Sequence, residues 1–145
     1  MDFAKVFEYV MLPLSIAEAD YPNNLIYVNK AFCELTGYSA EELIGTNPGK
    51  LLQKDGPDSK RIAMRDKLNH YEPIDVLVKN YRKDGTWFWN GLHIHPVIED
   101  GKCSYWVGRA TDVTAYVENV NAGLEAIVST LKDSFHQMKN DLKLG

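Results

Sequence analysis

The chain has 145 residues, of which 45% are apolar and 25% are charged, and its net charge is −4. These totals fit one domain with a hydrophobic core, and an acidic chain without a Lys/Arg cluster argues against a nucleic-acid partner. The longest apolar run, Tyr9 to Ala17, is interrupted by Pro13 and is too short to cross a bilayer. Asp2 and Glu8 also make it a poor signal peptide, so we expect a cytoplasmic protein with no membrane partner.

The first 28 residues predict a short helix and a hairpin. Residues 2–11 carry apolar side chains at helical spacing, and Pro13 should end that helix. Two short apolar runs, 14–17 and 25–28, flank turn residues and therefore predict two paired strands.

Helical patterns dominate the next part of the chain. From Lys30 to Gly45 the pattern is helical, but Gly37 interrupts it. Ser39 and Glu42 form a capping box that should start a new helix. The tripeptide Asn47-Pro48-Gly49 is expected to break the pattern.

A further helix is predicted across residues 59–69. We expect Ile62, Met64 and Leu68 to face the protein interior, because they are its apolar positions.

The second half of the domain predicts an antiparallel meander. Residues 74–81, 87–97 and 104–111 are rich in strand-forming side chains, and Asp-Gly turn signals separate them. Together with the N-terminal hairpin they give an α+β fold, a five-stranded antiparallel sheet with inserted helices on one face.

Residues 115–143 predict a long C-terminal helix with an apolar seam. The seam positions repeat every seven residues and are Val117, Val120, Leu124, Ile127, Leu131 and Met138. We interpret this as a helix that leaves the domain and pairs with a second copy. The alternative is a helix that folds back on its own sheet.

Strand alternation assigns side chains to two faces of the sheet. One face is apolar but includes Asn80 and Asn90. Because an unpaired buried amide costs about 1–3 kcal/mol, both need hydrogen-bond partners. A flat ligand with amide groups would supply them, and the alternative is that each bonds to nearby backbone.

The other face carries a set of large apolar and aromatic side chains, which are Leu77, Tyr81, Trp87, Trp89, His93, Tyr105 and Val107. A patch of this size is expected to be covered. The N-terminal helix, the start of the C-terminal helix and a second protomer are the candidates. We favour a homodimer in which the terminal helices cross this face.

Three segments resemble PAS domains, and specifically their flavin-binding Light-Oxygen-Voltage (LOV) branch. They read NKAFCELTGYSAEELIG at 29–45, NYRKDGTWFWNGLHIHP at 80–96 and VGRATDVT at 107–114. The resemblance covers roughly residues 12–114, so we expect a sensor domain there, preceded by a cap helix at 1–11 and followed by a signalling helix at 115–145.

The resemblance also implies a flavin, FMN or FAD, and the residues that hold it. Asn80 and Asn90 would bond the pyrimidine edge of the ring, and Leu92 and Ile94 would pack on it. Other positions match polar groups around the cofactor: Asn47 and Gln53 near the flavin, Arg65 at the phosphate and Lys50 near the second phosphate-binding position.

The sequence departs from the LOV pattern at two positions. The family motif Asn-Cys-Arg-Phe-Leu-Gln is replaced by NPGKLLQ at 47–53, so Pro48 stands where the photoactive cysteine is expected. Ala110 stands where the family has a glutamine beside the flavin. We therefore expect a sensory module that binds flavin noncovalently and senses redox state, or light without a cysteine adduct. Trp106 is a candidate redox or packing partner.

Two alternatives remain open. The first is a cofactor-free PAS module for dimerisation, with an unknown downstream effector. The second is a heme-based gas sensor, for which His70 is the histidine near the pocket helices. His93 and His95 alone do not make a metal site, and no catalytic motif is present, so neither a metal nor an enzyme is expected.

Overall fold

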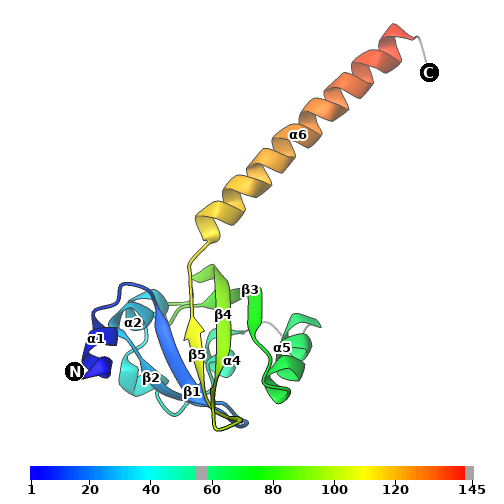
Figure 1. Ribbon diagram of the computed structural model, residues 1–145. Helices are drawn as coiled ribbons and strands as arrows, with labels where there is room; N and C mark the ends of the chain where they lie inside the picture. Colours follow the sequence, from blue (N-terminus) through cyan, green and yellow to red (C-terminus); the bar gives the residue numbers. More distant parts are fainter. Residues whose placement is uncertain (55–58, 143–145) are drawn as a thin grey trace. The chain divides into compact units, whose positions relative to one another are not determined.

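The computed structural model describes residues 1–54 and 59–142, and it divides into two compact units. The first unit, Met1–Val113, contains the sheet and most of the helices (Figure 1). The second unit, Thr114–Gly145, contains one long helix. All five strands of the sheet lie in the first unit.

A five-stranded sheet organises the first unit, and its strand order is β2-β1-β5-β4-β3. The strands are β1 (Leu14–Glu18), β2 (Leu25–Val28), β3 (Ile74–Tyr81), β4 (Trp87–Glu99) and β5 (Lys102–Arg109). All neighbouring strands are antiparallel. The predicted α+β architecture is therefore confirmed.

Among the described residues, one helix precedes the sheet and four helices are inserted between β2 and β3. They are α1 (Phe3–Glu8), α2 (Lys30–Thr36), α3 (Ala40–Leu43), α4 (Pro48–Leu52) and α5 (Ser59–Asn69). Gly37 ends α2 in a left-handed conformation with φ 77°, and the predicted capping box of Ser39 and Glu42 begins α3. In Figure 1, α2 and α4 lie behind the sheet.

Three sequence-based expectations about the helices were wrong. Pro48 begins a helix instead of breaking one, because the side chain of Asn47 caps the first turn and proline is well tolerated at the first helical position. The first helix ends at Glu8, three residues earlier than Met11. Ile62 is 66% exposed, so it does not face the interior.

The two faces of the sheet have the predicted assignment. Val78 pairs with Asn90 and Asn80 pairs with Phe88, and all four side chains are buried on the helix-covered face together with Trp106. The strand phase on which the site prediction rests is therefore correct.

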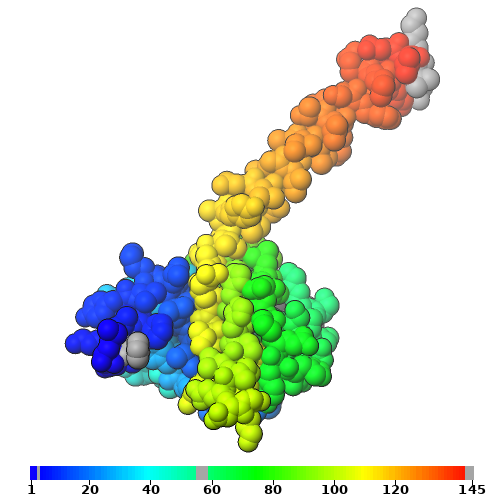
Figure 2. Space-filling model, in the orientation of Figure 1, coloured from blue at the N-terminus to red at the C-terminus, as the bar shows by residue number. Residues whose placement is uncertain are grey.

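The opposite face exposes an apolar patch, which we call the outer patch. It consists of Leu77, Trp87, Trp89, Tyr105 and Val107, and four of them are at least 36% exposed: Leu77, Trp87, Tyr105 and Val107. Figure 2 shows atoms of β4 and β5 at the surface of the molecule. The hydrogen bonds of α1 go to Tyr27 and Asn29, at the β2 end of the sheet, so α1 does not lie over Trp87.

The second unit contains α6 (Thr114–Asp141), which confirms the predicted long helix. The predicted end at Lys143 lies outside the described residues. Within this unit the seam positions Leu124, Ile127, Leu131 and Met138 are 51–63% exposed. No helix in the described part of the chain is long and apolar enough to cross a membrane.

Asn29 joins the N-terminal segment to the sheet and to α2. Its side chain is 1% exposed, and its Oδ1 accepts hydrogen bonds from the backbone N–H groups of Leu14 and Phe32, at 2.9 and 3.0 Å. Its Nδ2 shares its two hydrogens among the carbonyl oxygens of Phe7, Val10 and Leu12, at 2.8–3.2 Å. One buried amide thus caps a helix and fixes the path of the chain before β1.

We predict that Asn29→Ala lowers the free energy of unfolding by about 3 kcal/mol, because it removes a helix cap worth about 1 kcal/mol and leaves buried backbone groups unpaired at about 1–3 kcal/mol. Urea-induced unfolding measures this change. The control is Ser39→Ala, which removes an exposed cap alone and should cost about 1 kcal/mol. Equal losses for the two variants would contradict the role assigned to Asn29.

Candidate functional site

A cavity of about 120 Å³ lies between the inner face of the sheet and helices α2, α4 and α5. One water needs roughly 10–15 Å³ of such space, so the cavity has room for a ligand of many atoms. Of the predicted site residues, eight line it: Asn47, Gln53, Arg65, Asn80, Asn90, Leu92, Ile94 and Trp106. The structure therefore brings together most of the residues that the sequence singled out.

Asn80 and Asn90 form a hydrogen-bonded pair on the sheet wall of the cavity. The Nδ2 of Asn90 donates to the Oδ1 of Asn80 at 2.9 Å, and both residues are 3% exposed. The backbone N–H of Thr111 donates to the Oδ1 of Asn90 at 3.1 Å, and the Nδ2 of Asn80 donates to the Lys79 carbonyl. The amides thus bond nearby backbone, as one interpretation expected, and they also line a cavity, so the ligand of the other interpretation stays a prediction.

The amide pair keeps capacity for a ligand. Each carboxamide has two N–H donors and a carbonyl oxygen with two lone pairs. The hydrogen bonds described above use one N–H of each amide. The pair can therefore also bind a ligand edge that presents both donors and acceptors.

Arg65 and Asn23 form a polar end of the cavity. The Nη1 of Arg65 donates to the Oδ1 of Asn23 at 2.7 Å, and the guanidinium lies 5.0 Å from the centroid of the Tyr21 ring. Asn23 is 8% exposed, and its Nδ2 donates to the carbonyl oxygens of Glu18 and Ala19. This places a half-buried cation in the cavity lining, where an anionic ligand group can reach it.

Sequence reasoning missed Asn23. Its backbone has φ 58°, a left-handed conformation that asparagine tolerates better than most residues. The signal was the turn segment Asp20-Tyr-Pro-Asn-Asn24, which we used only to predict a loop. Asn47, which caps α4, also bonds this loop, because its Nδ2 donates to the Pro22 carbonyl at 2.6 Å.

The remaining walls are apolar. Leu92 and Ile94 on β4 line the sheet side, and Phe32, Leu52 and Met64 line the helix side. Gly108 keeps the sheet wall flat, because a Cβ there would lie 2.7 Å from the Oγ of Ser15. A planar, mainly apolar ligand suits this shape.

Trp106 forms part of the wall without filling the cavity. Its side chain is 2% exposed, and its Nε1 donates to the Ala19 carbonyl at 3.0 Å. The indole also stacks on Tyr71, with ring centroids 6.2 Å apart and an interplanar angle of 30°. The indole is therefore held in place from two sides.

Two predicted site residues lie elsewhere. Lys50 is solvent-exposed on α4, and Ala110 is buried in the hydrophobic core cluster with Leu25 and Leu43. Pro48, which replaces the expected cysteine, lines the cavity.

No cysteine lines the described part of the cavity. Cys33 is partly buried against the core cluster, and burial, with a contribution from Glu8, raises the pKa of its thiol. The reactive thiolate is thus disfavoured at this position.

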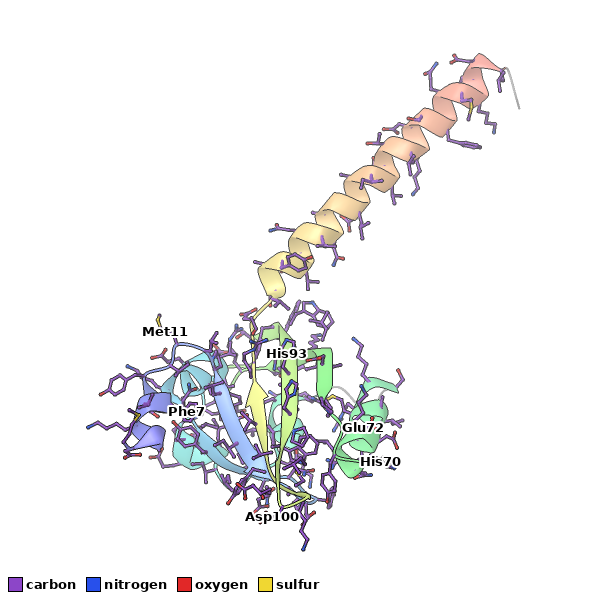
Figure 3. The ribbon with its side chains drawn as sticks, viewed as in Figure 1. Phe7, Met11, His70, Glu72, His93 and Asp100 are labelled. Atoms are coloured by element: carbon purple, nitrogen blue, oxygen red, sulfur yellow. The ribbon has the colours of Figure 1, made fainter. Side chains whose placement is uncertain are left out.

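Histidines are also absent from the described lining of the cavity. His70 lies at the end of α5, exposed to solvent, where a hydrogen bond to the Asp66 carbonyl raises its pKa (Figure 3). His93 bonds to Asp75 from the opposite face of the sheet. Among the described residues, no group of three or more His, Cys, Asp or Glu side chains could hold a metal ion.

A family model described as a PAS domain matches residues 13–115. That range contains all five strands and every residue of the cavity wall. The chain belongs to the PAS domain family.

Within this family the PAS domain is LOV-like. It is 36% identical over 115 residues to a blue-light-activated histidine kinase of Brucella melitensis, an alignment that covers 77% of this chain and 23% of the relative. It is 44% identical over 93 residues to a blue-light photoreceptor of Listeria monocytogenes, covering 63% of this chain and 36% of the relative. The chain thus spans about a quarter to a third of these relatives.

Solved structures give the same placement. The LOV domain of the Erythrobacter litoralis blue-light-activated histidine kinase superimposes with a TM-score of 0.67 at 34% identity, covering 72% of this chain and 98% of that domain. An RNA-binding Light-Oxygen-Voltage receptor superimposes with a TM-score of 0.81 at 30% identity, covering 92% of this chain and 38% of the receptor chain. The PAS domain therefore has the fold of LOV sensory domains.

We predict that Asn90→Ala destabilises the PAS domain more than Asn80→Ala does. The first substitution leaves the Thr111 N–H without its acceptor and the Asn80 Oδ1 without its donor, and the second leaves the Asn90 Nδ2 without its acceptor and the Lys79 carbonyl without this donor. The first loss is larger, because an unpaired buried N–H is tolerated less well than a carbonyl oxygen that lacks one of its bonds. The difference should be about 1 kcal/mol or more in the free energy of unfolding, measured by urea titration. Asn69→Ala, at an exposed asparagine of α5, is the control and should have little effect. Equal losses for Asn80→Ala and Asn90→Ala would show that the Thr111 bond carries no net stabilisation.

Proposed function

We propose that this PAS domain is a sensory module that binds a flavin, FMN or FAD, noncovalently in the cavity. The observation that carries the proposal is the paired Asn80 and Asn90 on the wall of an otherwise apolar cavity. Relatives described as a blue-light photoreceptor and as blue-light-activated histidine kinases support it. The stimulus is the redox state of the flavin, or light absorbed by it.

The residues present fit a flavin. Its ring is flat and apolar over most of its area, and its pyrimidine edge alternates hydrogen-bond donors and acceptors. Asn80 and Asn90 would bind that edge, Leu92 and Ile94 would pack on the ring, and Arg65 would attract the phosphate. When bound, the flavin would supply reversible electron acceptance and absorption of blue light.

Binding without a covalent bond follows from the residues around the cavity. Pro48 occupies the lining where the LOV motif has its cysteine, and proline has no nucleophilic group. The only cysteine on a neighbouring helix among the described residues, Cys33, packs against the core cluster and has a raised pKa. The response must therefore arise from changed hydrogen bonds or charge.

The proposed route out of the cavity runs through Asn90. Its Oδ1 accepts a hydrogen bond from the N–H of Thr111, in residues 111–113, which we call the exit segment. Two backbone hydrogen bonds of 2.9 Å also join this segment to β4, from the Gly91 N–H to the Thr111 carbonyl and from the Val113 N–H to the Trp89 carbonyl. Thr111 stands three residues before Thr114, where α6 begins. A ligand whose hydrogen bonding to the Asn90 amide changes therefore changes how strongly Asn90 binds the exit segment.

A second contact holds the same exit segment. The Nη2 of Arg82 lies 2.9 Å from the Oδ2 of Asp112, and both side chains are about one-third exposed. An ion pair with this exposure is worth about 1 kcal/mol or less. This ion pair therefore adds little to the hydrogen bonds that hold the exit segment, and Asn90 remains its contact with the cavity wall.

We also infer that the output requires a second copy and an effector. α6 exposes an apolar seam and the sheet exposes the outer patch, both of which suit a homodimer. Histidine-kinase activity belongs to the Brucella and Erythrobacter relatives, and for this chain the proposal is limited to the sensory step.

Flavin binding is tested by the visible spectrum of the purified chain and by titration with FMN and with FAD. We expect the purified chain to retain flavin absorbance or to take up added flavin. The Asn80→Ala variant should bind flavin about tenfold more weakly or worse, which is equivalent to about 1.4 kcal/mol. Asn69→Ala is the matched control, since that amide is on the surface of α5. A colourless chain that takes up neither flavin would refute the proposal and favour a cofactor-free dimerisation module, and a Soret band would favour heme.

The homodimer is tested by sedimentation of the full chain. Leu124→Asp combined with Leu131→Asp should shift the chain to monomer, because charges in an apolar seam are costly to bury. Glu125→Ala combined with Lys132→Ala, one position along the same helix, should leave the oligomeric state unchanged. If the variant with both aspartates is still a dimer, the dimer contact is assigned to the outer patch.

A further inference from the structure

An aromatic pair connects the cavity to the protein surface. Trp106 is 2% exposed and lines the cavity, whereas Tyr71 is 43% exposed. Their rings stack with centroids 6.2 Å apart and an interplanar angle of 30°. Electrons pass readily between aromatic rings in such contact, so the pair provides a path from the cavity wall to solvent.

A carboxylate lies at the outer end of this path. The Oη of Tyr71 donates a hydrogen bond to the Oδ1 of Asp20 at 3.1 Å. Oxidation of a phenol makes it a strong acid, so a carboxylate in this position can accept its proton. In the resting protein the bond to Asp20 raises the pKa of Tyr71, which keeps the phenol protonated until it is oxidised.

The inner end of the path has a different partner. The Nε1 of Trp106 donates to the backbone carbonyl of Ala19 at 3.0 Å, and a carbonyl oxygen is far too weak a base to take the proton. An oxidised indole there would keep its proton and remain a strong oxidant. It would therefore pass the oxidation outward to Tyr71.

We propose that Trp106, Tyr71 and Asp20 form an electron-donor relay for a photoexcited flavin in the cavity. The flavin gains one electron from the Trp106 indole, the indole regains one electron from Tyr71, and the Tyr71 O–H proton moves to the Asp20 carboxylate. This inference rests on the proposed flavin binding and gives a domain without a cysteine in its described cavity lining a lasting response to light.

The relay draws on three distant parts of the chain. Asp20 lies in the turn after β1, Tyr71 follows α5 and Trp106 lies on β5. The same turn also holds Asn23, the partner of Arg65. A change of charge at Asp20 would thus occur in the loop that borders the cavity.

The experiment uses the full chain loaded with FMN, illuminated with blue light in the absence of oxygen. Tyr71→Phe keeps the ring and its stacking but removes the O–H, and Asp20→Asn keeps a hydrogen-bond acceptor but removes the base. The matched control is Tyr27→Phe, because the Oη of Tyr27 also bonds a carboxylate, Glu8 at 3.3 Å, but Tyr27 lies outside the cavity lining. The readouts are the lifetime of photoreduced FMN, by absorbance, and a tyrosyl radical signal, by electron paramagnetic resonance.

We expect a tyrosyl signal in the unsubstituted chain and in Tyr27→Phe, and its loss in Tyr71→Phe. The lifetime of the reduced flavin should fall about tenfold or more in Tyr71→Phe and Asp20→Asn, which corresponds to a lowering of the barrier to its reoxidation by about 1.4 kcal/mol. FMN affinity should be unchanged in all three variants.

Two results would overturn the relay in distinguishable ways. If Tyr71→Phe binds FMN and keeps both the radical signal and the lifetime, the relay is wrong and flavin binding stands. If the unsubstituted chain binds no FMN, the relay and the proposed function fail together. If Tyr71 had only a structural role, Tyr71→Phe would change the near-ultraviolet circular dichroism spectrum of the chain without added FMN, and the tyrosyl signal would remain.

Discussion

The arrangement of the site depends on one constraint, which is that buried amides must be hydrogen-bonded. Asn80 and Asn90 lie on the inner face of β3 and β4, where leaving either unpaired costs about 1–3 kcal/mol. They meet this demand by bonding each other and the backbone of Lys79 and Thr111. The same bonds that stabilise the sheet therefore prepare the ligand wall and hold the exit segment.

A second group of contacts closes the cavity around the turn after β1. Asn47 from α4, Arg65 from α5 and Trp106 from β5 all bond residues of that turn. The turn carries polar backbone and side-chain groups that would otherwise need water. Because the turn bonds α4, α5 and β5, it fixes the distances between these three elements. That spacing leaves a cavity where a collapsed core would otherwise form.

The departures from the LOV pattern have a common consequence. Pro48 removes the nucleophile from the cavity lining, and Ala110, in the hydrophobic core cluster, has no amide with which to sense the ligand. The polar side chains that line the cavity and also bond other parts of the domain include Asn90, Trp106, Arg65 and Asn47. Any response of this domain to a bound ligand must pass through groups of this kind.

The sequence by itself determined the strand phase, the helices with clear caps, the family and eight of the cavity-lining residues, because period-2 alternation and capping motifs act over a few neighbouring residues. It misplaced Ile62 and read Pro48 as a helix breaker, since burial and capping depend on what packs opposite. Only the tertiary structure brought Asn23 to Arg65 and Tyr71 to Trp106. These pairs join residues 42 and 35 positions apart, and no local pattern encodes such contacts, because they follow from how the turn, α5 and β5 pack together.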